Sequence, residues 1–129
     1  MIRTKSVRTP AEPRQDGLRI LAARFRGRGL PASAYDVWMP NLAPSEGLLR
    51  GFLEGGIPWA EFSRRYRAEM SAASPVDEQN RTIKNHGQKF TLRLLKTLAE
   101  RGTVTLLCHC GEDEAHCHRH LLRALIERV

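Results

Sequence analysis

Residues 103–108 read Thr103-Val104-Thr105-Leu106-Leu107-Cys108, and this stretch decides the fold. It is short, β-branched at its start and apolar beyond it, which is typical of a strand covered on both faces. Before it, apolar residues recur at helical spacing from Gln88 until Gly102, a natural helix stop. After it, the pattern predicts a last helix that begins near Cys117. This helix–strand–helix run indicates an α/β fold: a small layered domain with a mostly parallel central sheet flanked by helices.

Upstream, the chain predicts three more strands and two more helices. Proline, glycine and polar clusters separate the apolar runs and mark the turns. The strands are expected at residues 2–7, 18–24 and 35–39, one helix after the N-cap Ser45 and another from Pro58, with a long polar loop over 71–87. Without internal repeats, residues 1–129 are expected to form a single α/β domain.

The positive charge of the chain is concentrated in its first quarter. The formal net charge is +7, and residues 1–30 contain eight basic residues against two acidic ones. The remaining residues are nearly balanced, with thirteen basic and twelve acidic side chains. Such asymmetry favours an anionic partner, either a small molecule or a nucleic acid. The alternative is a solvated basic surface that keeps the protein in solution.

The composition also bears on the cellular compartment. No stretch of about 18 apolar residues is present, so no membrane association is expected. No apolar signal region follows the basic N-terminus, so secretion is not expected. The cysteines are odd in number and crowd into the last quarter, which disfavours a disulfide framework. A cytoplasmic protein fits these features best.

One short segment, residues 108–120, concentrates the side chains that could carry chemistry. It holds all three cysteines and four of the five histidines. In one interpretation it is an anion site, because Cys117, His118 and Arg119 would lie in the first turn of the last helix, where free N–H groups favour negative charge. The same position lowers the pKa of a cysteine. The cysteine phosphatase spacing Cys-x5-Arg is absent, which disfavours a covalent phosphoryl mechanism.

Two other interpretations of this segment remain open. Cysteine and histidine are the ligands that zinc prefers, which would make residues 108–120 a zinc-binding site. The paired Cys-x2-Cys knuckle is missing, however, so the spacing supports this only weakly. In the other interpretation the residues are structural: Cys108 ends a buried strand as a small apolar side chain, and the acidic residues complement a helix start.

A second candidate segment follows the strand predicted at residues 18–24. Arg24 and Arg28 flank a glycine-containing loop there, and glycine lets the backbone approach a ligand closely. In parallel α/β sheets ligands collect beyond the carboxyl ends of the strands. This loop and the Cys/His segment are therefore expected to converge at one edge of the sheet.

Several motifs together resemble the domain of unknown function 488 family. They are the run Arg24–Leu30, the tetrapeptides at 36–39 and 42–45, the set Trp59, Phe62, Tyr66 and Glu69, and the strand at 104–108 followed by Cys117-His118-Arg119. The resemblance covers nearly the whole chain and implies a small α/β protein of bacterial cytoplasmic type, with no established reaction. It implies ligand or catalytic roles for Arg24, Arg28, Glu112, Cys117, His118 and Arg119. Arg26 and Gly27 replace the tryptophan and proline that similar proteins usually carry.

The leading hypothesis is an anion site that binds a nucleotide, a phosphorylated metabolite or a nucleic-acid backbone, with no cofactor and no metal. Arg24, Arg28 and Arg119 would bind the ligand. If the protein is an enzyme, Cys117 would be the nucleophile, with His118 or Glu112 as proton carrier. The alternatives are a non-enzymatic nucleic-acid-binding module, which would show steep salt dependence, and a zinc-binding protein. The sequence does not indicate the oligomeric state.

Overall fold

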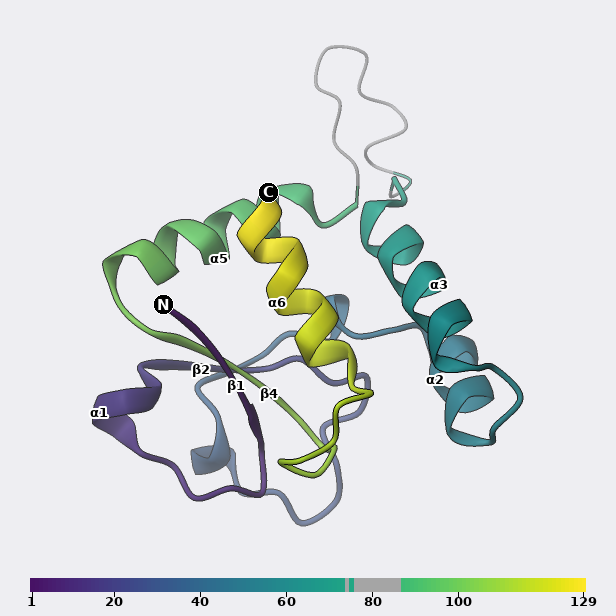
Figure 1. Ribbon diagram of the computed structural model, residues 1–129. Coiled ribbons are helices and arrows are strands. Elements are labelled where there is room, and N and C mark those ends of the chain that lie inside the picture. The colour runs from purple at the N-terminus through teal and green to yellow at the C-terminus, as the bar shows by residue number, and fades with distance from the viewer. Residues whose placement is uncertain (74, 76–86) are drawn as a thin grey trace.

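The computed structural model describes residues 1–73, 75 and 87–129 of the chain. Helices lie against a central sheet, which Figure 1 shows nearly edge-on beneath α5 and α6. The strands are β1 (Ile2–Ser6), β2 (Leu18–Leu21), β3 (Val37–Trp38) and β4 (Val104–Cys108). The α-helices are α1 (Pro13–Asp16), α2 (Glu46–Leu53), α3 (Trp59–Ser71), α5 (Lys89–Arg101) and α6 (His118–Arg128), and short 3₁₀ turns cover Ala32–Ala34 and Pro40–Leu42. The loop predicted over 71–87 lies mostly outside the described residues.

The sheet has the strand order β1-β4-β2-β3, and every pair in it is parallel. The strand quoted first, β4, is therefore central, and its five residues are buried. Ser6 of β1 lies opposite Cys108, and Leu21 of β2 lies opposite Leu107. The carboxyl ends of these three strands consequently meet at one edge, which confirms the predicted α/β class with a mostly parallel sheet.

Three local predictions differ from the structure. β2 ends at Leu21 rather than near Arg24. Beyond Leu21, the Ala22 N–H makes the last hydrogen bond to β4, to Leu107 O at 2.8 Å. β3 is two residues long, because Pro40 begins a 3₁₀ turn directly after Met39. The one-turn helix α1 was not expected; it starts on a proline, the residue whose φ suits the first helical position.

Most of the core lies between one face of the sheet and the helices. α6 lies across β1 and β4, with α5 on one side and α3 on the other, while α2 packs on α3 (Figure 1). The alternate β4 residues Val104 and Leu106 point into this core with Leu122 and Ile126 of α6. The opposite face carries a smaller cluster under the loops, formed by Val7, Leu21, Ala23 and Leu107.

A buried ion pair joins α1 to β1 on that second face. Lys5 and Asp16 are 3% and 1% exposed, and Lys5 Nζ lies 3.1 Å from Asp16 Oδ2. Lys5 also donates to Pro10 O at 2.8 Å, and Asp16 accepts from the N–H of Glu12 at 2.8 Å. The two charges thus satisfy each other inside the fold. One of the eight basic residues of the first quarter is therefore unavailable to a partner.

None of the helices in the described part of the chain is long and apolar enough to cross a membrane.

Candidate functional site

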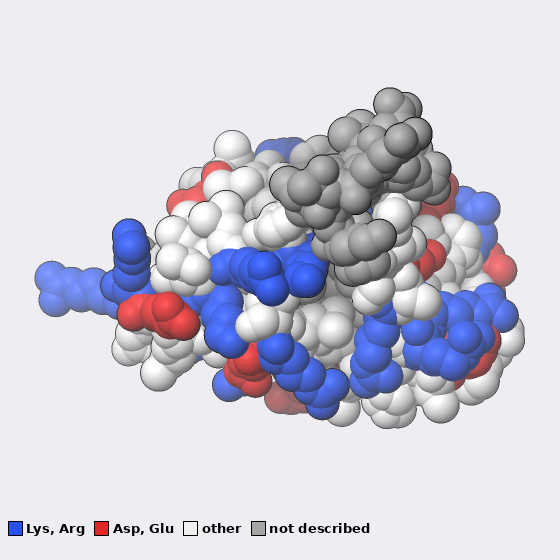
Figure 2. Space-filling model, turned by 90° about the horizontal axis from the view of Figure 1, so that it is seen from above, with Lys and Arg blue, Asp and Glu red and all other residues white. Residues whose placement is uncertain are grey.

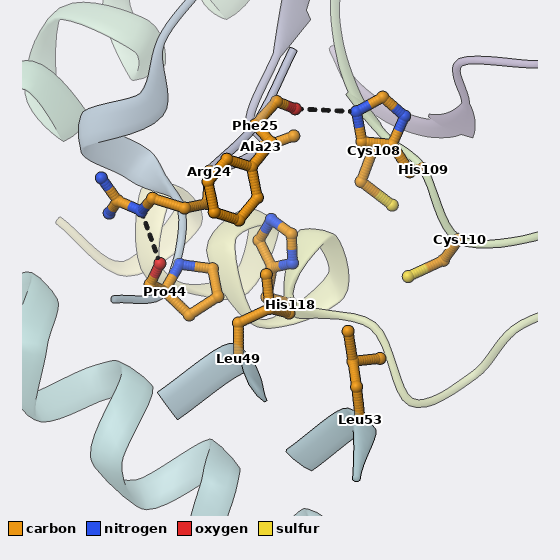
Figure 3. Close-up of a pocket in the computed structure, with 10 residues that line it drawn as sticks. All are labelled: Ala23, Arg24, Phe25, Pro44, Leu49, Leu53, Cys108, His109, Cys110 and His118. Carbon is orange, nitrogen blue, oxygen red and sulfur yellow. Dashed lines mark hydrogen bonds between the residues drawn. The ribbon is translucent and has the colours of Figure 1, made fainter. Parts of the chain in front are cut away.

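The carboxyl ends of β2 and β4 border a pocket of about 320 Å³ (Figure 3). The segment after β2, the start of α6, helix α2 and the loop after β4 enclose it. Its lining residues are Ala23, Arg24, Phe25, Pro44, Leu49, Leu53, Cys108, His109, Cys110 and His118. The two segments that the sequence marks as candidates therefore converge here, with a largely aliphatic wall on the α2 side.

All three cysteines gather at this pocket. Cys108 ends β4 and Cys117 is the N-cap residue of α6, so the loop between them brings their Sγ atoms to 2.8 Å. Cys110 lies in that loop, and the three Sγ atoms all lie within 4.8 Å of one another. Cys108 and Cys110 line the pocket and Cys117 does not; Cys108 and Cys117 are both buried, at 1% and 2% exposed.

Arg119 holds this cluster from within the protein. Its side chain is 1% exposed, and its Nη1 donates to Cys108 Sγ at 3.0 Å. The other acceptors are the backbone carbonyls of Cys110, Gly111 and Glu112, at 3.0–3.3 Å. Nε has no partner among the described residues. No carboxylate in the described ranges pairs with this guanidinium, so the Cys108 sulfur is the group that can neutralise its charge.

The three thiols differ in pKa because their surroundings differ. Hydrogen bonds with the Cys110 and Cys117 thiols, reinforced by the charge of Arg119, hold the pKa of Cys108 far below its usual range. The same hydrogen bond with Cys108 raises the pKa of Cys117 and raises that of Cys110 to about 11. Burial alone would lower the pKa of Arg119, but the charge on Cys108 outweighs the effect of burial and raises that pKa. One thiolate, on Cys108, beside two neutral thiols is the consistent state.

His118 lines the pocket and is nearly buried. Its Nε2 is hydrogen-bonded to the carbonyl of Ala22, and its ring meets Tyr66 edge-on with centroids 5.7 Å apart. Burial lowers the pKa of His118, against the raising effect of the Ala22 carbonyl. The imidazole is therefore neutral at pH 7. Because Nε2–H donates to the carbonyl, Nδ1 is left as the acceptor of the ring.

His109, one of the histidines that the zinc interpretation of residues 108–120 includes, forms a wall on the other side of Cys108. Its Nε2 lies 2.8 Å from Phe25 O, so the ring ties β4 to the segment after β2 (Figure 3). Gly27 passes close to it, with φ of +90°. A Cβ at Gly27 would lie 2.8 Å from His109 Cε1, so only glycine fits there.

The structure brings three of the six candidate residues together and places the other three apart. Cys117 belongs to the thiol cluster, Arg119 contacts it, and His118 lines the same pocket. Arg24 lines the pocket, but its guanidinium points away from the sulfurs and donates to Pro44 O at 2.9 Å and Ala43 O at 3.1 Å (Figure 3). Arg28 lines a neighbouring hollow. Glu112 faces β1 and accepts hydrogen bonds from Ser6 N–H and the Thr9 hydroxyl.

Glu112 is ionised in this setting. Burial by itself would raise its pKa, but the Ser6 and Thr9 hydrogen bonds and the charge of Arg119 outweigh that effect and lower it. The carboxylate thereby fastens the loop after β4 to the end of β1.

The basic residues of the first quarter are dispersed. Arg19 pairs with Asp36 at 3.1 Å, and Arg26 donates to the Tyr35 hydroxyl while lying over its ring. Seen from above, Lys and Arg side chains form several separate groups with Asp and Glu beside them (Figure 2). The surplus charge therefore does not form one continuous patch on the face in that view.

Cys108 is the residue whose position the sequence-based hypothesis undervalued. The sequence favours a structural role for Cys108, as a small apolar side chain at a strand end. In the structure, its sulfur is the one that Arg119 contacts. The available signal was its place at the carboxyl end of the central strand, where parallel sheets bind ligands.

Comparison with known proteins gives one match. No curated protein and no solved structure matches the chain. A family model described as DUF488-N3a, an active DUF488-N3 subclade, matches residues 2–129. Since the match spans nearly the entire chain, this protein belongs to the domain of unknown function 488 family, within the DUF488-N3a group.

Proposed function

We propose that this protein is a thiol enzyme and that Cys108 is its nucleophile. One observation carries the proposal: the buried guanidinium of Arg119 donates to the Cys108 sulfur and has no carboxylate partner among the described residues. A buried cation needs a compensating anion, and a Cys108 thiolate supplies it. The thiolate, not the thiol, is the reactive form of cysteine.

The surroundings of Cys108 suit a reaction with a small substrate. Its side chain lines the 320 Å³ pocket, so a ligand in that pocket lies against the sulfur. The thiolate would bond to an electrophilic atom of the substrate, and the leaving group would depart with the bonding electron pair. Neutral His118, whose Nδ1 is an acceptor, is placed to take a proton from water or a second thiol in the release step.

This proposal gives Cys108 the role that the sequence-based hypothesis gave Cys117. Cys117 does not line the pocket, and its Sγ lies 2.8 Å from that of Cys108, so in this proposal its S–H would support the thiolate. Arg119 keeps the role of charge stabiliser. The description of the matched family as an active subclade agrees with a working site.

The test is capture of a covalent intermediate. Purified protein would be mixed separately with p-nitrophenyl acetate, an acyl donor, and thiosulfate, a sulfur donor, and the intact mass recorded after rapid quenching. We expect an adduct with at least one donor, mapped to Cys108, lost in Cys108→Ser and retained in Cys110→Ser. If neither donor gives an adduct, or if the adduct survives in Cys108→Ser, the proposal fails.

Zinc binding is a second candidate function, because three sulfurs lie within 4.8 Å of one another. Three thiolates of Cys108, Cys110 and Cys117 could hold zinc and leave one coordination position open. Cobalt substitution tests this directly: thiolate-to-cobalt charge-transfer bands that disappear in Cys110→Ser would support a zinc site. A protein that takes up no stoichiometric cobalt or zinc after reduction would exclude it.

A further inference from the structure

We propose that the substrate is an anion and that Arg8 and Arg28 bind its charged group in a second hollow, on the far side of His109 from the thiols. The inference rests on the proposed thiol function and adds the chemical class of the substrate. Of the three arginines that the sequence assigns to the ligand, Arg24, Arg28 and Arg119, the inference keeps Arg28, and it adds Arg8.

The second hollow adjoins the thiol pocket. It has a volume of about 400 Å³ and is lined by Val7, Arg8, Gly27, Arg28, Gly29, Leu30 and His109. His109 lines both hollows, so its ring is the partition between them. The N–H of Val7 donates to Cys108 O at 2.9 Å, which places the start of the Arg8 segment directly beside the nucleophile's own backbone.

The lining of this hollow is suited to an anion. Arg8 and Arg28 are exposed, and neither has an ion-pair partner within the described residues. Among the residues that the structure describes, no carboxylate lines the hollow. In contrast, Lys5 and Arg19 of the same chain quarter are already paired with Asp16 and Asp36. Two free guanidinium groups facing one cavity recognise phosphate, sulfonate or carboxylate oxygens.

The backbone adds further donors. Gly27 and Gly29 have φ of +90° and +74°, and no group in the described part of the chain accepts a hydrogen bond from the backbone N–H of residues 27–29. Successive free N–H groups in a turn with positive φ form a concave site for anions. A Cβ at Gly27 would collide with His109, so the absence of a side chain at Gly27 lets the backbone of this loop lie against the His109 ring.

The described residues give the thiol pocket itself no free cation. The Arg24 guanidinium is bound to the carbonyls of Ala43 and Pro44, and that of Arg119 is buried against Cys108. Its wall on the α2 side is apolar, with Leu49 and Leu53. A substrate that spans both hollows would therefore place its carbon skeleton near α2, its electrophilic atom at Cys108 and its anionic group at Arg8 and Arg28.

A matched pair of thiol reagents tests the inference. The 2-sulfonatoethyl and 2-trimethylammonioethyl methanethiosulfonates differ in the charge of the tail. With either one the Cys108 thiolate attacks the sulfenyl sulfur, a mixed disulfide forms, and methanesulfinate leaves with the bonding electrons. Labelling rates at Cys108, located by peptide mapping, would be compared in the wild type, in Arg8→Met/Arg28→Met, and in Arg14→Met/Arg101→Met. The last variant removes the same charge from exposed positions just before β2 and β4, at the opposite edge of the sheet.

We expect the wild type to prefer the anionic reagent. The ratio of anionic to cationic rates should fall by about threefold or more in Arg8→Met/Arg28→Met at low salt, and by much less in the control variant. An equal fall in both variants would mean that only net charge matters and would overturn the inference.

A titration with inorganic phosphate separates this inference from the proposed function. At constant ionic strength, the amide resonances of Gly27 and Gly29 should shift saturably in the wild type and in Cys108→Ser, and not in Arg8→Met/Arg28→Met. Saturable shifts combined with slow Cys108 labelling would leave the anion site standing and refute the thiol function. Shifts that persist in Arg8→Met/Arg28→Met, or that never saturate, would refute the anion site whatever the thiol does.

Discussion

The guanidinium of Arg119 lies 3.0 Å from the sulfur of Cys108, eleven positions earlier in the chain, and both side chains are almost fully buried. An arginine cannot discharge itself by losing a proton at any pH a folded protein survives. A negative charge on the Cys108 sulfur, which the guanidinium contacts directly, therefore compensates for its burial. The relationship links stability to reactivity: the ion pair that keeps Arg119 inside also keeps Cys108 in its nucleophilic form.

The first prediction concerns the pH dependence of Cys108 alkylation. With the pKa held far below its usual range, the thiolate is already formed at pH 5, so the iodoacetamide rate at Cys108 should be nearly constant from pH 5 to 8. An ordinary cysteine, with a pKa of about 8.5, loses about tenfold in rate for each pH unit below that value. Peptide-mapped alkylation measures this, and a tenfold fall per unit at Cys108 would contradict a buried thiolate.

The second prediction is that Arg119→Met weakens both the fold and the thiolate. Loss of one partner of a buried pair costs about 3–5 kcal/mol when the other charge stays uncompensated. Cys108 can escape part of that cost by taking up a proton, so we expect a loss of about 2–3 kcal/mol in the free energy of unfolding, measured with urea. The pKa of Cys108 should rise, and its alkylation at pH 6 should slow by at least about tenfold.

Arg123→Met is the matched control for that variant. Arg123 lies one turn further along α6 and pairs with Glu127 at 2.9 Å, but both side chains are about half exposed. Exposed pairs of this kind contribute about 0.3–0.5 kcal/mol. If Arg119→Met proves as mild as Arg123→Met in stability and in alkylation rate, the charge-balance argument is incorrect.

The third prediction concerns oxidation. One equivalent of hydrogen peroxide should convert the Cys108 and Cys117 thiols to a disulfide, because their sulfurs lie 2.8 Å apart and Cys108 is the thiolate. The two thiols lose two hydrogens and two electrons, and peroxide is reduced to two waters. The product should resist iodoacetamide at Cys108 and recover with dithiothreitol. Non-reducing peptide mapping identifies the link, and a link between Cys108 and Cys110 as the main product would contradict the expectation.

The sequence predicts the architecture because the deciding signals are local. The apolar strand predicted at 103–108 and the N-cap predicted at Ser45 depend on neighbouring residues. The strand is found at Val104–Cys108, and Ser45 Oγ accepts from Leu48 N–H at 3.3 Å. The meeting of the segment after β2 with the Cys/His segment also follows from a general property of parallel sheets. The one-turn helix α1 was missed because four residues hold too little periodicity to detect.

The partners within the site could not be predicted in the same way. Arginine is normally an exposed residue, so no sequence pattern indicates that Arg119 is buried while Arg123, one turn on, is not. Arg24 was assigned to the ligand because it follows a strand, yet its guanidinium is taken by the carbonyls of Ala43 and Pro44, twenty residues later. The acceptor that an arginine side chain contacts depends on which groups, distant in the sequence, would otherwise lack a hydrogen-bond partner in the folded chain.

The last prediction concerns the buried pair of Lys5 and Asp16. Burial would raise the pKa of Asp16, but the Glu12 N–H, Lys5 and Arg3 together outweigh it and lower the pKa below the ordinary value. A carboxyl whose pKa is lowered by folding stabilises the protein above its unfolded pKa of about 4 and loses that contribution as pH falls through the folded pKa. Asp16→Asn leaves Lys5 buried without its counter-ion, so we expect a loss of about 3 kcal/mol at pH 7.

The difference in unfolding free energy between the wild type and Asp16→Asn should therefore shrink as pH falls below about 4, because the Asp16 carboxyl of the unfolded wild type then binds a proton that the folded protein, with its lower pKa, does not yet bind. Glu46→Gln serves as the control, since its partner Arg50 is exposed and the pair should contribute no more than about 0.5 kcal/mol. Urea unfolding at pH 7, 5 and 3 measures all three proteins. A difference between wild type and Asp16→Asn that stays constant down to pH 3 would show that Asp16 supports α1 by shape and hydrogen bonding and not by charge.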